Sequence, residues 1–273
     1  MSFSQRDQTI LSDLEKAQAT HRDLKELLDF YENLFRAQFA YKSRLEESGK
    51  AEDLAKKEIN LAGLANGLPQ ITFDELNVES APFMDLYKSI FQLLIPYAGD
   101  RHGLEAAPPP EKIIEWAREI FLSRGPLVIS GVTGEWARTA SGFILAPYLQ
   151  LACDLILPRI PLNLWYREYC PVCGGRPAFA ALTSETGPRT LLCPRCYGEW
   201  DYNRIGCPFC KSTDAQTYYS DDEGSYRLYV CKACTRYLKM VDVRERKRNV
   251  CLPVECLVTV SMDIAAQEKG FLF

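Results

Sequence analysis

Apolar residues in the first 165 positions recur three or four residues apart, which is the stripe of an amphipathic helix. In residues 21–47 the stripe consists of Leu24, Leu27, Leu28, Tyr31, Leu34, Phe35 and Phe39. The same spacing predicts helices within residues 51–69, 82–98 and 110–124. Gly67 and Pro69 end the first of these, and Pro109 and Pro110 suit the entry to a helix that begins near Glu111. We therefore predict a helical N-terminal domain.

Residues 142–162 are mostly apolar and predict a core helix that runs into an extended exit at Pro158 and Pro161. The stretch is too interrupted for us to expect a membrane span. The first 18 residues lack the apolar core and the cleavage site of a secretory signal, so we expect a cytoplasmic protein. In a reducing cytosol, the 11 cysteines favour metal binding or redox chemistry over structural disulfides.

The pattern changes near Trp165. From there, helical spacing is replaced by cysteine pairs, Gly, Pro and short strand-like runs. The net charge changes as well, from −6 for residues 1–165 to +2 for residues 166–273. We predict a helical domain over 1–165, a first rubredoxin-like metal ribbon over 166–203, and a second ribbon with a short C-terminal helix over 204–273.

The C-terminal part contains an internal repeat of CxxC, about 20 residues, and CxxC. The pair Cys170 and Cys173 recurs 37 residues later as Cys207 and Cys210, and the pair Cys193 and Cys196 recurs 38 residues later as Cys231 and Cys234. Between the pairs, residues 176–193 and 215–231 each predict a strand, a polar turn with glycine, and a second strand. Two small antiparallel modules are therefore expected.

Paired cysteines at this spacing are a strong indication of metal binding. Each CxxC turn directs two thiolates at one ion, and the hairpin carries the second pair to its other side, so that four sulfurs form a tetrahedron. We predict sequential sites because each hairpin then closes a short loop, whereas interleaved sites would need longer loops. Gly174 and Gly198 are expected to give the backbone freedom after the two turns of the first module.

Four thiolates around a divalent ion leave a net charge near −2, which the nearby Arg195, Lys211 and Lys232 would offset. We expect the ions, rather than a large apolar interior, to organise this third of the chain. Spacing does not separate iron from zinc, because a tetrahedron of thiolates suits both ions. Disulfide formation or thioredoxin-like chemistry is the alternative, although such chemistry normally uses one CxxC pair. A closed four-thiolate site also fits a purely structural role.

The other candidate residues carry less information. Cys153 lies in an apolar run and is interpreted as a buried small hydrophobe, and Cys251 and Cys256 fit no CxxC spacing. The sequence has two histidines and none of the common hydrolase, nucleotide-binding or zinc-protease motifs, which argues against an enzyme. A net charge of −4 argues against nucleic acid as the main partner.

Three segments resemble one known family, the FdhE-type formate dehydrogenase accessory proteins. They are CPVCGGRP, LLCPRCYGEWDYNRIGCPFC and YVCKACTRYLKMVD, and the second contains Glu199, Trp200 and Arg204 between two cysteine pairs. The apolar residues 143–156 and the closing residues 262–271 are also similar to the family. One segment departs from it, because Glu255 and Cys256 stand where members usually carry an acidic pair before the last helix.

The resemblance implies a cytoplasmic, non-catalytic protein that binds two metal ions through paired rubredoxin-like sites. It also implies that the protein contacts the catalytic subunit of respiratory formate dehydrogenase before that subunit is exported by the twin-arginine route. The family association shifts the preferred metal from zinc towards iron. Two alternatives remain: a rubredoxin-like redox protein that acts on the same client, and a zinc-ribbon protein that binds nucleic acid.

Overall fold

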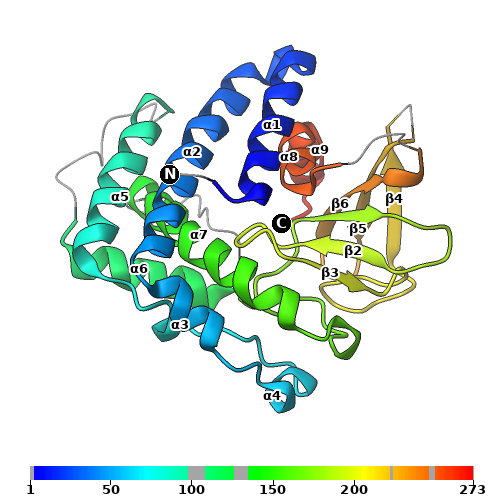
Figure 1. The fold of residues 1–273 in the computed structure, drawn as a ribbon. Coiled ribbons are helices and arrows are strands. Elements are labelled where there is room, and N and C mark those ends of the chain that lie inside the picture. Colours follow the sequence, from blue (N-terminus) through cyan, green and yellow to red (C-terminus); the bar gives the residue numbers. More distant parts are fainter. Residues whose placement is uncertain (1–2, 98–107, 126–134, 222–223, 246–249, 273) are drawn as a thin grey trace.

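The computed structural model describes residues 3–97, 108–125, 135–221, 224–245 and 250–272 (Figure 1). Its α-helices are α1 (Gln5–Thr20), α2 (Lys25–Glu47), α3 (Lys50–Lys56), α4 (Leu61–Ala65), α5 (Ser80–Leu94), α6 (Pro110–Ser123), α7 (Glu135–Ile156), α8 (Leu252–Val258) and α9 (Val260–Glu268). Its strands are β1 (Phe179–Leu182), β2 (Arg189–Leu192), β3 (Glu199–Tyr202), β4 (Gln216–Ser220), β5 (Tyr226–Cys231) and β6 (Arg236–Asp242). The fold is a helical part followed by a small sheet and two C-terminal helices.

The predicted helices are present, with three differences. The stretch 51–69 forms two short helices, because the side chain of Asn60 accepts a hydrogen bond from the Gly63 N–H and starts α4 as a new helix. Helix α1 was not predicted, although its buried apolar residues follow the same spacing as those of α2. The single predicted C-terminal helix is divided at Thr259 into α8 and α9.

Helix α7 is the central element of the helical part, and α2, α3, α5 and α6 all pack against it. Among the described residues, Thr139–Arg159 has the length and apolar composition to cross a membrane, but 83% of that window is buried inside the structure. This burial agrees with the core helix predicted from the sequence. Pro147 lies inside the helix and removes one N–H donor, so the Phe143 carbonyl accepts from the Gln38 side chain instead, at 2.9 Å.

The six strands form one sheet in the order β3-β2-β1-β6-β5-β4. Both predicted hairpins are confirmed, as the antiparallel pairs β1/β2 and β4/β5. Strand β1 of the first repeat also pairs in parallel with β6 of the second repeat, with Phe179 opposite Lys239. The two repeats therefore share a continuous sheet. The residue limits of the three predicted domains stay a prediction.

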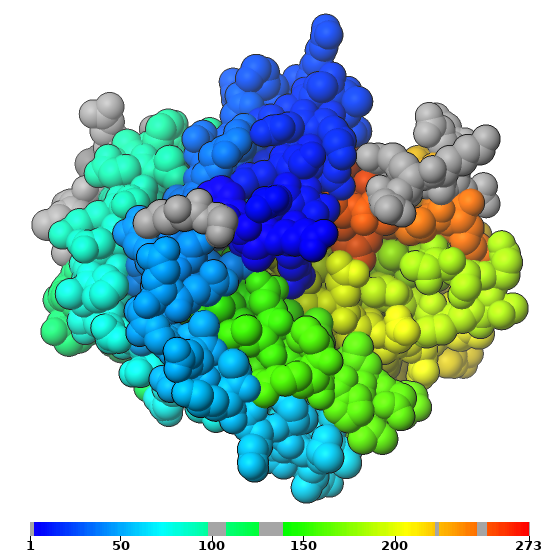
Figure 2. All heavy atoms as spheres, in the orientation of Figure 1, coloured from blue at the N-terminus to red at the C-terminus, as the bar shows by residue number. Residues whose placement is uncertain are grey.

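The sheet and the helices enclose a common interior. The largest apolar core joins residues of α2, α5, α6 and α7 with Trp165, Trp200 and the cysteines of the first repeat. Helix α8 packs against α1 and β1, while α9 packs against β5 and β6, and the space-filling view shows the parts in continuous contact on one face (Figure 2). The expectation that ions replace an apolar interior is thus wrong for the first repeat, which lies within the main core.

Candidate metal centres

The four CxxC turns have the same backbone shape. The residue directly after the second cysteine is left-handed in each turn, with φ of 70° at Gly174, 57° at Tyr197, 65° at Lys211 and 55° at Thr235. In the first three turns its N–H donates to the carbonyl of the first cysteine, at 2.9–3.0 Å. The conformation predicted for Gly174 is confirmed. The prediction for Gly198 is wrong, because Tyr197 takes the left-handed conformation and Gly198 does not.

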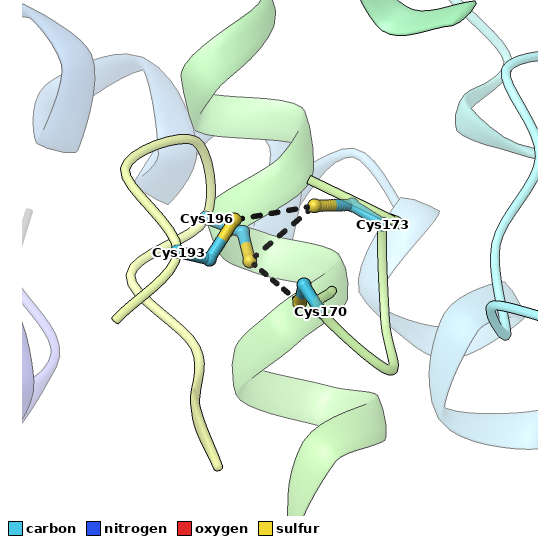
Figure 3. A group of neighbouring side chains, drawn as sticks. All are labelled: Cys170, Cys173, Cys193 and Cys196. Carbon is cyan, nitrogen blue, oxygen red and sulfur yellow. Dashed lines mark hydrogen bonds between the residues drawn. The ribbon is translucent and has the colours of Figure 1, made fainter. Parts of the chain in front are cut away.

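The turns of the first repeat bring Cys170, Cys173, Cys193 and Cys196 together, and we call these four residues the first cysteine group (Figure 3). The sulfur–sulfur distances are 3.5 Å for Cys170–Cys196, 3.5 Å for Cys173–Cys193 and 3.7 Å for Cys173–Cys196. A tetrahedron with metal–sulfur bonds of about 2.3 Å has edges of about 3.8 Å. A disulfide would need about 2.05 Å. The spacing of these sulfurs therefore fits a tetrahedral metal site.

The turns of the second repeat form the second cysteine group, which consists of Cys207, Cys210, Cys231 and Cys234. The sulfur–sulfur distances are 3.7 Å for Cys207–Cys234 and 3.6 Å for Cys210–Cys231. All eleven cysteines are free thiols. The cysteines thus group sequentially, as the loop-length argument expects, and their ligation of metal stays a prediction.

The two groups differ in their access to solvent. In the first group no cysteine is more than 2% exposed. In the second group Cys207 and Cys231 are buried, whereas Cys234 is partly exposed and Cys210 is exposed. A metal ion in the first group would be enclosed by protein, and one in the second group would be reachable from solvent.

Two glycines leave room for the first cysteine group. A Cβ atom added at Gly175 would lie 2.8 Å from the Cys193 sulfur, and one added at Gly198 would lie 3.3 Å from the Cys196 sulfur. The same added atom at Gly198 would lie 3.0 Å from the sulfur of Cys153, a fully buried residue of α7. The sequence prediction of a buried Cys153 is therefore met, and the structure adds that this fifth thiol borders the first group.

A buried arginine accompanies each cysteine group. Arg195 is fully buried and donates from Nη2 to the Phe121 carbonyl at 3.1 Å, and Arg189 is fully buried and donates from Nη2 to the carbonyl of Gly206, the residue before Cys207. The Nε and Nη1 atoms of both side chains have no hydrogen-bond partner among the described residues. A buried cation is costly without an anionic neighbour, and a four-thiolate site supplies that charge.

The sequence correctly indicated Arg195 but did not indicate Arg189, whose position becomes clear only from the packing of the two repeats. The other two proposed cations lie outside the interior. Lys211 is exposed and lies 3.7 Å from a Glu168 oxygen, and Lys232 is also exposed. The buried positive charge near the second cysteine group is therefore that of Arg189, which belongs to the first repeat.

The environment divides the thiols of the first group by their acidity. Burial raises the pKa of the Cys170 and Cys196 thiols above its ordinary value. Hydrogen bonds from Cys170 and the other two cysteines lower the pKa of Cys173, and the positive charge of Arg195 lowers it further. Burial thus opposes the thiolate form of Cys170 and Cys196, and a bound cation would be needed to hold these two as thiolates.

The residues that depart from the family pattern have structural partners. Glu255 is 3% exposed and accepts a hydrogen bond from the Tyr226 hydroxyl. The Cys256 carbonyl accepts from Lys239 Nζ at 2.7 Å. Cys251 and Cys256 lie outside both cysteine groups.

No protein-family model matches the chain. A protein named Protein FdhE homolog from Aquifex aeolicus is 27% identical over 220 residues, which are 77% of this chain and 73% of that protein. An FdhE homolog from Pectobacterium carotovorum is 32% identical over 110 residues, and Protein FdhE from Escherichia coli is 29% identical over 109 residues. The last two matches each span 35% of the relative's length.

The crystal structure of the FdhE protein from Pseudomonas aeruginosa has the same fold. It matches with a TM-score of 0.61 and 23% sequence identity, over 99% of this chain and 92% of that one. The predicted fold class is confirmed: a helical N-terminal part, two four-cysteine modules on a small sheet, and a C-terminal helical segment. The resemblance to the FdhE family, predicted from the cysteine segments, is confirmed as well.

Proposed function

We propose that this FdhE-like chain is a non-catalytic, metal-binding accessory protein for the maturation of respiratory formate dehydrogenase. It binds the catalytic subunit of that enzyme in the cytoplasm, before the subunit is exported by the twin-arginine route. The two cysteine groups each hold one metal ion, with iron preferred over zinc. The observation that carries the proposal is the convergence of eight sulfurs into two groups of four within an FdhE-like fold.

The surroundings of the sulfurs support metal at both groups. Their spacing matches a tetrahedral site, and Arg195 and Arg189 each present unpartnered N–H groups in the interior, where an anionic centre would stabilise them. A bound ion, whether iron or zinc, would cross-link the CxxC turns. Only iron would also supply one-electron chemistry. The chain's own residues position the thiols and exclude water from the first group.

The unequal exposure of the groups favours one alternative, a rubredoxin-like redox protein that acts on the same client. Cys210 is exposed, so electrons could pass between the second group and a docked partner. The nucleic-acid alternative gains no such support, because Arg189 and Arg195 are buried and contribute nothing to a phosphate-binding surface. Reversible bleaching of an iron-loaded sample on reduction would favour the redox role, and an unchanged visible spectrum would remove it.

Complementation tests the accessory role. Cells that lack the gene should have low respiratory formate dehydrogenase activity, and the unaltered chain should restore it. The double variant Cys170→Ser/Cys173→Ser should fail to restore it, while Cys251→Ser, at a cysteine outside both groups, should succeed. Full restoration by a variant that lacks both groups would refute the metal-dependent role.

Binding and metal content require purified components. The chain should be purified without oxygen, its metal content measured, and the sample mixed with the unexported catalytic subunit. We expect two metal ions per chain and a complex on size-exclusion chromatography. A metal-loaded chain that forms no complex with that subunit would refute the proposed partner without affecting the metal sites.

A further inference from the structure

Strand β4 ends the six-stranded sheet, and among the described residues its only strand partner is β5. The two strands are antiparallel, with Tyr218 opposite Tyr229. In Figure 1, β4 lies at the rim of the sheet, on the side away from α2. Residues 217–220 are all exposed to solvent. This edge of the sheet is therefore reachable by another molecule.

The ladder with β5 shows which backbone groups of β4 face the open edge. The Lys232 N–H donates to the Ala215 carbonyl at 2.9 Å, and the Asp221 N–H donates to the Tyr226 carbonyl at 3.2 Å. Opposite residues in an antiparallel pair alternate between hydrogen-bonded and non-hydrogen-bonded pairs, so the odd-numbered residues of β4 bond to β5. The even-numbered residues direct their N–H and C=O groups outward, and these are Gln216, Tyr218 and Ser220. No backbone bond from another described residue reaches these outward groups.

Strand β4 lacks the features that normally protect an exposed edge. Such edges usually carry a charged side chain, a proline or a bulge. The strand reads QTYYS, without a charge or a proline, and each of its five residues has one partner in β5. An exposed edge of this kind is a template for pairing with a strand of another chain.

The rings on one face of this edge form a short stack with an open end. The centroids of Tyr218 and Tyr229 are 5.3 Å apart, and the two rings are stacked at 28°. Arg227 lies over the Tyr218 ring at 5.4 Å and is held there by its ion pair with Asp242, at 2.7 Å. Tyr218 is nevertheless 51% exposed. The stack therefore ends in solvent at the middle residue of the strand.

We propose that β4 pairs antiparallel with β4 of a second copy of this chain, about a two-fold axis at Tyr218. In that register Tyr218 faces its own counterpart, and Gln216 faces Ser220 of the other copy. Because these three residues all direct N–H and C=O groups outward, each outward group gains a partner. The two Tyr218–Tyr229 stacks meet on the same face, and the uncharged strands do not repel each other.

The observations favour a second copy over an unrelated extended peptide. A peptide of arbitrary sequence would satisfy the same backbone groups without continuing the stack of tyrosine rings. The contact is short, so its buried area falls below the roughly 1,200 Å² of stable complexes, and we expect a dissociation constant of about 10–100 µM. The inference goes beyond the proposed function, because self-association requires no client.

Sedimentation velocity tests the proposal on the metal-loaded, full-length chain. Concentrations run from about 5 to about 500 µM, on either side of the expected dissociation constant. A reductant is present, because the exposed Cys210 could otherwise form a disulfide between copies. We expect monomer at the lowest concentration and dimer at the highest. A chain that stays monomeric throughout overturns the proposal, even if a peptide of another protein binds to β4.

Two changes at Ser220 test the backbone pairing. Ser220→Pro removes one outward N–H and leaves the bonds between β4 and β5 in place. It should weaken dimerisation at least about tenfold, because one hydrogen bond is lost on each side of the axis. Ser220→Ala keeps the N–H and should leave the affinity unchanged. Equal affinity of the two folded variants would contradict the pairing.

Charges at Tyr218 test the position of the axis. Tyr218→Lys and Tyr218→Glu should each weaken self-association about tenfold or more, because like charges then meet at the axis. A mixture of the two variants should regain association, because opposite charges meet there instead. Tyr166→Lys, at a residue that is 71% exposed and outside the sheet, is the control and should dimerise like the unaltered chain.

The mixture decides the register even if Ser220→Pro does not fold. Undiminished dimerisation of Tyr218→Lys would place the interface elsewhere and overturn the proposal. A mixture of folded Tyr218→Lys and Tyr218→Glu that stays monomeric would contradict an axis at Tyr218.

Discussion

Gly198→Ala is the most direct test of the geometry of the first cysteine group. The added Cβ would lie 3.0 Å from the Cys153 sulfur, 3.3 Å from the Cys196 sulfur and 3.5 Å from the Cys170 sulfur. Ordinary van der Waals contact begins at about 3.4 Å. The sulfurs of Cys153 and Cys196 must therefore give way, and Cys196 is one of the four metal-binding candidates of the first group.

The expected cost follows from the packing of this region. All three neighbouring sulfurs are fully buried, so the strain cannot be released into solvent. Overpacking of a dense interior typically costs about 1–3 kcal/mol. We expect Gly198→Ala to reduce the free energy of unfolding by about 2 kcal/mol, and to lower the metal content of the first group while leaving that of the second group unchanged.

The assay is chemical unfolding of the metal-loaded chain, with metal content measured on the same samples. Gly125→Ala is the matched control, because among the described residues its added Cβ would meet only the Ser123 hydroxyl, at 3.6 Å. Cys153→Ala removes the closest contact, so the double variant Cys153→Ala/Gly198→Ala should recover about 1 kcal/mol relative to the sum of the single changes. Equal costs for Gly198→Ala and Gly125→Ala, with full metal content in both, would refute the reasoning.

Three further predictions concern the cysteine groups and the helical part. Cys170→Ser should remove one metal ion and Cys210→Ser the other, as measured by elemental analysis; loss of both ions from either variant would contradict independent sequential sites. A chelator should remove metal from the second group before the first, because Cys210 is exposed. Metal release is monitored by absorption or elemental analysis, and simultaneous release from both groups would count against this order. Lys42→Met should lower the free energy of unfolding by about 3–5 kcal/mol, as measured by thermal or chemical unfolding. In the unaltered chain Lys42 Nζ lies 2.7 Å from the buried Asp7 carboxylate, and the change leaves that carboxylate without its cation. The same change at the exposed Lys16 should cost less than about 1 kcal/mol, and equal costs would show that the buried pair contributes little.

Much of the candidate site was predictable because its determinants are local. A CxxC pair needs only a tight turn, and the residues that form it are adjacent in sequence, so spacing alone indicated all eight cysteines and both hairpins. The helix of residues 25–47 was also predictable, since its apolar stripe is a property of one segment. The family resemblance came from the same local segments.

Other features depend on contacts between distant segments and were not predictable. Arg189 begins a predicted strand, and its approach to Gly206 depends on how the two repeats pack. Gly198 was correctly singled out for the wrong reason: it provides space for the sulfurs of Cys196 and Cys153 and does not have a positive φ. Cys153 could be identified as buried from its apolar neighbours, but its place beside the first group could not.

The amino-acid sequence by itself determined which residues form helices, hairpins and CxxC turns, because hydrogen bonds and steric limits within a short segment set those shapes. Only the tertiary structure decided the parallel pairing of β1 with β6, the enclosure of one cysteine group and the exposure of the other. These outcomes depend on which surfaces exclude water together when the whole chain packs, and no single segment carries that information.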